Sequence, residues 1–294
     1  MATRKPAAKR VPVGRQPPEA ASAPDSEAGA PAVTVEVRDS VALVALSRPE
    51  VHNAFNAALI RDLTEALLDV DADSTVRAVI LLAAGKSFCA GADLNWMRET
   101  TTYTRAQNLA DARALARLLR TLDTLSKPTI ARVHGPAYGG GVGLISCCDI
   151  AVASVDAMFA LSEAKLGIIP ATIGPYVIEA IGARQARRYL LSCERFPAAE
   201  AYRIGLVHDI VQTPELDQRI NEILGSLLLA GPAAQRACKA LIRAIAHRPI
   251  DAAVIDDTAK RIADVRATPE AKEGIAAFLG KRVAAWVPQS LRER

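Results

Sequence analysis

The feature that most constrains the fold is an alternation of short apolar segments with longer segments of helical period. The clearest apolar segment is "AVILLAA", residues 78–84, which contains no polar side chain. A strand of this kind is typically buried on both faces, as in parallel sheets that helices cover. Strand-like segments at 127–135 and 148–154 are separated from it by helical patterns. The chain is therefore predicted to be an α/β protein with parallel strand pairing.

Further elements extend this alternation in both directions. Segments 32–39 and 41–48 have the pattern of a β-hairpin, and Asn56 is a plausible N-cap for the amphipathic helix that follows it. Segment 103–126 predicts a long amphipathic helix. From about Glu200 the strand pattern ends, and the remaining segments are predicted to be helical: 215–231, 232–247, 251–268 and 269–282.

These patterns predict three regions. Residues 1–32 are rich in Pro, Ala and charge without apolar periodicity, which predicts a solvated tail. Its early basic residues weakly resemble a transit peptide, but many prolines and few serines favour the tail. Residues 33–200 form the α/β core, and residues 201–294 form a helical region that we expect to serve oligomerisation.

Composition excludes several classes of function. A net charge of +4 over 294 residues does not indicate nucleic-acid binding. The chain has no apolar run of about 18 residues, so no transmembrane helix is expected. Its five cysteines form no CxxC pair. They are predicted to be free thiols of a reducing compartment, and the protein is expected in the cytoplasm.

Three consecutive glycines, Gly139 to Gly141, stand in the stretch "AYGGGVGLISCCDI". The run fits GxGxxG in no register, and the chain has no GxxxxGK[ST] and no GxSxG motif. None of the four histidines belongs to a metal-ligand pair. A phosphate loop, a dinucleotide site, a nucleophile elbow and a metal centre therefore find little support. Close packing of a helix on a strand would also explain the glycines.

A second loop of small residues favours a functional explanation. "GKSFCAGADLNWM", residues 85–97, follows the buried strand, and "HGPAYGGG" follows the next one. Ligands bind at the carboxyl ends of parallel strands. If the two strands are neighbours, the N–H groups of Ala92 and Gly140 can converge on one point. Such a pair forms an oxyanion hole, and small residues leave room for the ligand's oxygen.

The order and spacing of six segments resemble the enoyl-CoA hydratase/isomerase (crotonase) superfamily over residues 33–288. The segments are "SRPEVHNAFN", "KSFCAGADLNWM", "ARVHGPAYGGGVGLISCCDIAVAS", "FALSEAKLGIIP", "EAYRIGLVHDIV" and "EGIAAFLGKR". The resemblance implies a spiral of ββα units with a helical C-terminal trimerisation region, assembled as a homotrimer or a dimer of trimers. It also implies acyl-CoA thioester substrates and no metal or redox cofactor.

The resemblance assigns roles to individual positions. Ala92 and Gly140 match the two N–H donors that hold the thioester oxygen. Glu163 matches the acid/base of the family, and burial among apolar residues would raise its pKa. Hydratases of the family usually carry a second glutamate three residues after the middle glycine. That position is Gly143 here, where no acid/base chemistry is available.

Other positions match contacts to coenzyme A. The loop "RPEVHNA" makes His52, Asn53 and Ala54 candidates for the adenine and pantetheine. Phe278 and Lys281 match residues that reach the coenzyme A of a neighbouring subunit, although helix packing or a surface charge would also explain them. The substrate-binding positions implied by the resemblance are Ala54, Ala92, Asp93, Leu94, Asn95, Gly140, Phe278 and Lys281.

The missing glutamate leaves the reaction open. Hydration is easiest with two carboxylates, whereas Δ3,Δ2-enoyl-CoA isomerisation needs one base, so Gly143 alone favours an isomerase. The segments around Asn95 and Glu163 instead resemble bacterial methylglutaconyl-CoA hydratase-like proteins of leucine and acyclic-terpene breakdown. We therefore expect an enoyl-CoA hydratase, with the isomerase as first alternative. An acyl-CoA-binding protein without chemistry is the second alternative.

The segment "IPATIGPYV" departs from the usual family pattern at Thr172, Pro175 and Tyr176. Because this loop lines the acyl end in relatives, we expect a branched or glutaconyl-type acyl group. A dicarboxylic acyl group would need a cation, for which Arg98 is a candidate, although a surface role fits it better. The group beside Gly143 should decide the reaction: a carboxylate there would restore two-acid hydration, and an apolar wall would favour a single-base reaction.

Overall fold

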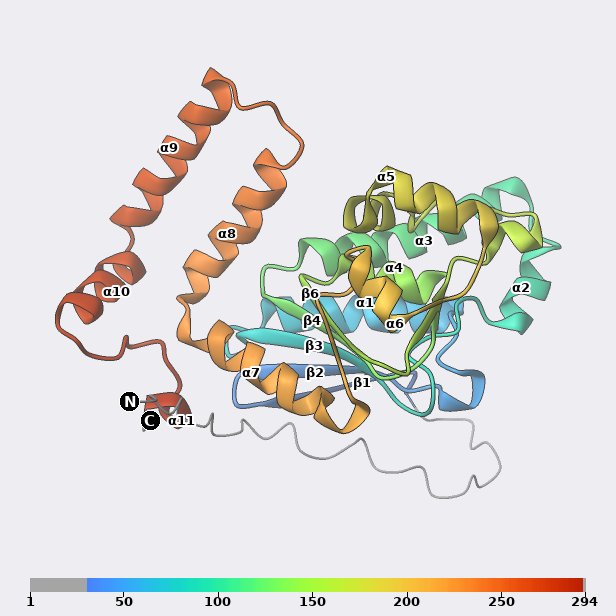
Figure 1. Ribbon diagram of the computed structural model, residues 1–294, viewed down its shortest axis with the longest axis horizontal. Helices are drawn as coiled ribbons and strands as arrows, with labels where there is room; N and C mark the ends of the chain where they lie inside the picture. The colour runs from blue at the N-terminus through green and yellow to red at the C-terminus, as the bar shows by residue number, and fades with distance from the viewer. Residues whose placement is uncertain (1–30, 293–294) are drawn as a thin grey trace.

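The computed structural model describes residues 31–292 and divides their strands between two sheets (Figure 1). The tail predicted at 1–32 lies almost wholly outside the described residues. The larger sheet has six strands in the order β1-β2-β3-β4-β6-β9. Its strands are β1 (Val33–Arg38), β2 (Val41–Leu46), β3 (Ala78–Ala83), β4 (Thr129–Val133), β6 (Ile150–Ser154) and β9 (Asp209–Val211). The smaller sheet contains β5 (Ala137–Tyr138), β7 (Met158–Ala160) and β8 (Phe196–Pro197).

Strand pairing confirms the predicted hairpin and the predicted parallel core. β1 pairs antiparallel with β2, and β2, β3, β4, β6 and β9 pair in parallel. The prediction that strands end near Glu200 is wrong, because β9 pairs with β6 beyond that residue. β9 has only three residues, all half-buried. Such a segment is too short to show a period of two, and the neighbouring strand stabilises it.

Both faces of β3 are covered, as its unbroken apolar sequence predicts. Val79 and Leu81 pack in one hydrophobic cluster with helices on one face, while Ile80 packs in a second cluster with α7. All three side chains are fully buried. Each stabilises the fold by about 2 kcal/mol relative to an exposed position.

Helices account for most of the remaining chain. On one face of the large sheet lie α1 (Ala57–Ala72), α3 (Arg105–Thr124), α4 (Gly140–Cys147) and α5 (Gly174–Ser192), and on the other lies α7 (Leu216–Leu229) (Figure 1). Asn56 caps α1, as predicted, by accepting a hydrogen bond from Leu59 N at 2.8 Å. The other helices of the core are α2 (Leu94–Thr100), α6 (Ala198–Arg203) and the 3₁₀ helices η1 (Pro49–Val51), η2 (Glu163–Leu166) and η3 (Thr213–Glu215).

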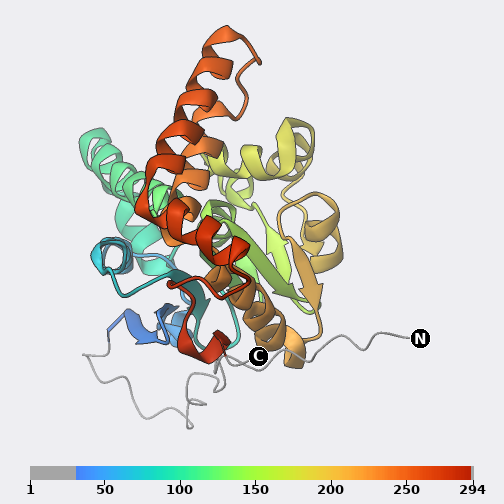
Figure 2. The same ribbon diagram turned by 90° about the vertical axis from the view of Figure 1, so that its left-hand side faces the viewer.

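The C-terminal helices form an arm that projects from the core (Figures 1 and 2). The arm consists of α8 (Pro232–Ile245), α9 (Ala252–Ala267) and α10 (Pro269–Leu279), and α11 (Gln289–Arg292) follows it. Lys239 of α8 anchors the arm, because its buried ammonium donates to Asp149 Oδ2 at 2.5 Å and to Lys127 O at 3.0 Å. Within the described part of the chain, no helix is both long and apolar enough to cross a membrane.

Candidate active site

The carboxyl ends of β3 and β4 bring the two small-residue loops together. The two strands are neighbours, as the oxyanion-hole hypothesis requires. Beyond the strands, Tyr138 N donates to Cys89 O at 2.8 Å. A Cβ placed on Gly139 would lie 3.9 Å from Gly91 Cα. The two loops are therefore in van der Waals contact.

The N–H groups of Ala92 and Gly140 are both left without a protein acceptor in residues 31–292. Phe55 pairs with the loop on either side of Ala92, because Phe55 N donates to Gly91 O and Asp93 N donates to Phe55 O. This parallel bridge turns the Ala92 N–H away from Phe55. Gly140 is the first residue of α4, where an N–H has no partner within the helix. Both residues line one cavity, so both donors are available to a ligand.

Close contacts explain the run of three glycines. Gly139 has φ +49°, a left-handed conformation that favours glycine. A Cβ on Gly140 would lie 2.7 Å from the Phe55 ring, and one on Gly141 would lie 2.7 Å from Cys89 O. Close packing of a helix on a strand therefore explains Gly141. Gly140 both packs tightly against Phe55 and has a backbone N–H without a protein acceptor among the described residues.

Glu163 stands beside these glycines. It begins η2, three residues after β7, and Gly139 N donates to Ala160 O at 2.9 Å. Glu163 Oε1 lies 2.9 Å from where a Cβ on Gly139 would be. Its other oxygen, Oε2, is buried and meets no hydrogen-bond partner among the described residues. Burial raises the pKa of Glu163, and its own backbone N–H only partly offsets this effect. A carboxyl with these properties is suited to general acid/base catalysis.

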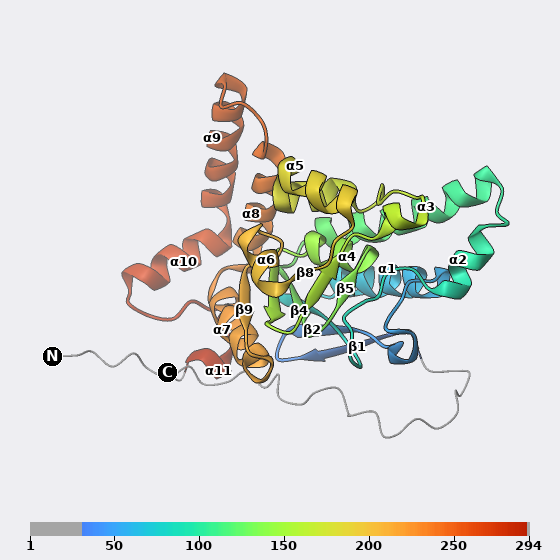
Figure 3. The same cartoon turned by 45° about the vertical axis from the view of Figure 1, so that its right-hand side comes forward.

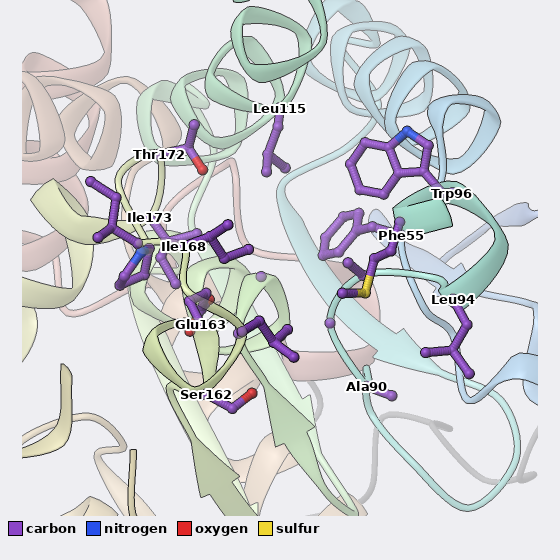
Figure 4. Close-up of a pocket in the computed structure, with 18 residues that line it drawn as sticks. Phe55, Ala90, Leu94, Trp96, Leu115, Ser162, Glu163, Ile168, Thr172 and Ile173 are labelled. Carbon is purple, nitrogen blue, oxygen red and sulfur yellow. The ribbon is translucent and has the colours of Figure 1, made fainter. Parts of the chain in front are cut away.

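Glu163, Ala92 and Gly140 line a cavity of about 380 Å³ (Figure 4). Its walls are mostly apolar and include Phe55 and Trp96. Glu163 is the only ionisable side chain in the cavity as formed by residues 31–292. Two further residues that line the cavity, Ser162 and Thr172, have a hydroxyl group.

An apolar wall stands beside Gly143. A Cβ on this residue would lie 2.3 Å from Ile173 Cγ2 and 3.5 Å from Leu119 Cδ2. Ile173 and Leu119 are buried, and Ile173 also lines the cavity. No carboxylate of the described chain therefore takes the place of the absent glutamate. Gly143 has no positive φ, so lack of space, and not backbone conformation, disfavours a side chain here.

Comparison with known proteins agrees with this geometry. Residues 36–289 match the family model described as "Enoyl-CoA hydratase/isomerase". The chain belongs to the enoyl-CoA hydratase/isomerase family.

Relatives of known name lie at moderate sequence identity. The "Crotonyl-CoA hydratase" of Syntrophomonas wolfei is 33% identical over 258 residues, which cover 87% of this chain and 97% of that protein. The "Short-chain-enoyl-CoA hydratase" of Clostridium acetobutylicum is 33% identical over 85% of this chain and 95% of its own length. The crystal structure of an enoyl-CoA hydratase from Shewanella pealeana has a TM-score of 0.85 at 42% identity, covering 87% of this chain and 96% of that one. The crotonase-like fold is confirmed.

Two of the positions that match coenzyme A contacts in this family also have structural partners. Asp93 accepts hydrogen bonds from Asn95 N and from the Arg48 guanidinium, whose Nη2 lies 2.9 Å from Asp93 Oδ2. Burial tends to raise the pKa of Asp93, but these donors outweigh it and hold the pKa below its ordinary value. Ala54 is buried, and its carbonyl accepts from Arg48 Nη1 at 2.6 Å. The Arg48 side chain thus ties the loop before α1 to the loop before α2.

The next two positions are more open. Leu94 is 70% exposed and lines the cavity. Asn95 is exposed, and its Oδ1 accepts from Arg98 Nη1 at 2.9 Å. Arg98 is exposed and does not line the cavity, and no other arginine of residues 31–292 lines it either.

Phe278 and Lys281 lie far from the cavity of their own chain. Phe278 stands on α10 in the arm, whereas the cavity lies between α2 and η2 in the core (Figures 1 and 3). Phe278 is 82% exposed, and Lys281 is exposed as well. Neither residue lines the cavity of its own chain, and their predicted contact with a neighbouring subunit's coenzyme A stays a prediction.

Phe55, Arg48 and Ile173 contribute to the site although no sequence motif predicts a role for them individually. Phe55 and Arg48 stand in the quoted segment "SRPEVHNAFN", so that segment was the available signal for both. Ile173 stands in the variant segment "IPATIGPYV". Nothing in a linear pattern shows that Ile173 packs on Gly143, since 30 positions separate them in the chain.

Proposed function

We propose that this protein is an enoyl-CoA hydratase that adds water across the C2=C3 bond of an acyl-CoA thioester with a single carboxylate. One observation carries the proposal: a half-buried carboxyl with one buried oxygen and a raised pKa stands beside two unpaired backbone N–H groups in one apolar cavity. This arrangement stabilises an enolate and moves a proton at its carbon. The names of the moderately similar relatives support hydration in particular.

Each step of the reaction has a group to perform it. The Glu163 carboxylate removes a proton from water while the water oxygen bonds to C3. The π electrons of the double bond shift toward the thioester, whose oxygen becomes negative and accepts hydrogen bonds from Ala92 and Gly140 N–H. Protonated Glu163 then gives its proton to C2. Water has been added, and the carboxylate is regenerated without a metal or redox cofactor.

The cavity supports an uncharged acyl group. Its lining contains no Lys, Arg or His within residues 31–292. An unpaired carboxylate buried among apolar side chains would be unfavourable by several kcal/mol. A branched aliphatic chain therefore fits this cavity better than a glutaconyl-type chain, the other acyl group that the sequence suggests.

Isomerisation is the second candidate, and the contact of Ile173 with Gly143 favours it. A single carboxyl can carry a proton between C2 and C4 of a 3-enoyl ester. This reaction needs the same oxyanion hole and no attacking water. An apolar wall at Gly143 removes nothing that isomerisation requires.

One pair of assays separates the candidates. Hydration removes the conjugated absorbance of a 2-enoyl-CoA, whereas isomerisation of a 3-enoyl-CoA creates it. We expect crotonyl-CoA or 3-methylcrotonyl-CoA to lose absorbance, with glutaconyl-CoA turned over more slowly. If only 3-enoyl esters react, the enzyme is an isomerase. If the esters bind and none reacts, the protein is an acyl-CoA-binding protein without chemistry.

We further propose that the protein acts as a homo-oligomer, a trimer or a dimer of trimers. The arm exposes large apolar side chains that a second chain could cover, among them Phe278 at 82%, Ile242 at 62% and Ile255 at 59%. Sedimentation of the purified protein would test this proposal, and a monomer at micromolar concentration would contradict it.

A further inference from the structure

The loop at 172–173 faces the cavity where family hydratases usually have a second acid. Its two residues differ in kind, because Ile173 is apolar and Thr172 has a hydroxyl. We infer that Thr172 is a catalytic residue that holds the attacking water, while Ile173 fills the space of the missing side chain. This inference rests on the proposed hydration.

Ile173 accounts for the volume. Its Cγ2 lies 2.3 Å from where a Cβ on Gly143 would be, and its Cβ lies 2.9 Å from that point. Distances this short exclude any side chain at position 143 while Ile173 keeps its place. The side chain is buried, on the residue that precedes α5, and has little room to move. A second acid therefore cannot reach the cavity from α4.

Thr172 supplies a polar group in place of the glutamate that is absent at position 143. Its side chain lines the cavity, and Figure 4 shows its hydroxyl oxygen turned toward the cavity. No hydrogen bond joins this hydroxyl to another group of the described residues. A free hydroxyl has two acceptor lone pairs and one donor. It can accept a hydrogen bond from a water molecule whose other proton goes to Glu163.

Ser162 is the other hydroxyl of the cavity and serves as the internal comparison. Figure 4 shows Ser162 and Thr172 on opposite sides of Glu163. Thr172 adjoins Ile173 in the chain and so lies at the end of the cavity near Gly143. Ser162 lies at the other end, with Ala90. A water that replaces the usual interactions of a glutamate at 143 belongs beside Thr172.

The proposed step balances. One water proton moves to the Glu163 carboxylate as the water oxygen bonds to C3. The second proton stays on that oxygen, becomes the proton of the product hydroxyl and donates to Thr172 Oγ1 throughout. Thr172 therefore orients the water and gains or loses no proton itself.

The test uses the full-length protein with Thr172→Val, which has nearly the shape of threonine but no hydroxyl. Hydration of crotonyl-CoA should fall about 10-fold in kcat, the upper range for losing one neutral hydrogen bond. Exchange of the C2 protons of butyryl-CoA with D2O should stay near the wild-type rate. Exchange requires Glu163 and the oxyanion hole but no attacking water, so a folding defect would lower both rates. Thr172→Ser should restore hydration.

Ser162→Ala removes the other hydroxyl of the cavity and should lower hydration less than Thr172→Val does. If Thr172→Val hydrates crotonyl-CoA as fast as the wild type, or if Ser162→Ala lowers hydration more than Thr172→Val does, the role of Thr172 is contradicted. Equal losses of hydration and exchange in Thr172→Val contradict it as well, because they show a structural effect. A wild-type protein that hydrates no ester overturns the proposed function and this role together. The other outcomes against the role leave hydration by the wild-type enzyme in place.

Discussion

Two walls of one cavity differ in how they are built. The polar wall contains Glu163 and the N–H groups of Ala92 and Gly140, and backbone pairing of strands and loops places all three. The wall at Gly143 is apolar, and side-chain packing of Ile173 forms it. Proton transfer and enolate stabilisation belong to the polar wall. The fate of the enolate, hydration or isomerisation, depends on what the apolar wall admits.

This difference has a physical origin. A backbone N–H is present whatever the side chain, so small residues and a strand pairing suffice to supply it. A second carboxylate needs both a suitable residue and space. In this chain glycine stands at position 143 and Ile173 fills the space beside it, so neither condition for a second carboxylate is met.

The largest effect should come from removing the only acid/base of the polar wall. In Glu163→Gln, glutamine has nearly the shape of glutamate and can still form hydrogen bonds, but its amide does not act as an acid or base in water. Turnover of enoyl-CoA should fall about 1000-fold, within the usual range for a general acid/base. Binding of the coenzyme A ester, measured by calorimetry, should be nearly unchanged. A mutant with near-normal rates would remove Glu163 from the mechanism.

A smaller loss should follow from disturbing the backbone donor. A Cβ on Gly140 would meet the Phe55 ring at 2.7 Å and shift the loop. Gly140→Ala should therefore lower kcat/KM about 100-fold, as the loss of one oxyanion-hole donor does. Phe55→Leu in the same background should recover part of the rate by making room. Absence of any recovery would show that the clash with Phe55 is not the cause.

The packing of Ile173 at the apolar wall can be tested by placing a glutamate at position 143. Gly143→Glu alone should lower the free energy of unfolding by about 3 kcal/mol, because it overpacks against Ile173. Gly143→Glu combined with Ile173→Gly should lose less stability in urea denaturation than the sum of the losses of the two single variants, because the two positions are in contact. If Gly143→Glu were as stable as the wild type, Ile173 would have to move aside at little cost in free energy.

The pH dependence of stability can sharpen the assignment of Glu163. Burial raises its pKa above the ordinary 4.5, so the unfolded chain ionises first as pH rises. The folded state therefore loses stability between pH 4.5 and the raised pKa, and keeps this deficit at higher pH. Glu163→Gln should raise the melting temperature at pH 7 and lose this advantage in acid below the ordinary value. Equal melting curves at both pH values would contradict a raised pKa.

The smallest effect is expected at Arg98. It is exposed and its guanidinium pairs with Asn95, outside the cavity. Arg98→Ala should change kcat/KM about twofold or less with crotonyl-CoA and with glutaconyl-CoA alike. A selective loss with glutaconyl-CoA would show that Arg98 reads a distal carboxylate after all.

Much of the fold could be predicted because it depends on local patterns. The continuous apolar run at β3, the N-cap at Asn56 and the hairpin of β1 and β2 all follow from near neighbours in sequence, and the structure confirms them. β9 was missed because three residues show no period and only pairing with β6 makes them a strand. The structure confirms that β3 and β4 are neighbours, as the oxyanion-hole hypothesis requires.

By itself the sequence determined the α/β core, the two small-residue loops and the absence of a carboxylate at position 143. These are properties of residue type and order, which no packing can alter. Only the tertiary structure decided that Ile173 fills the space at Gly143, that Thr172 faces the cavity and that Arg98 does not. Such contacts join residues far apart in the chain, and their distances follow from how helices and strands pack together.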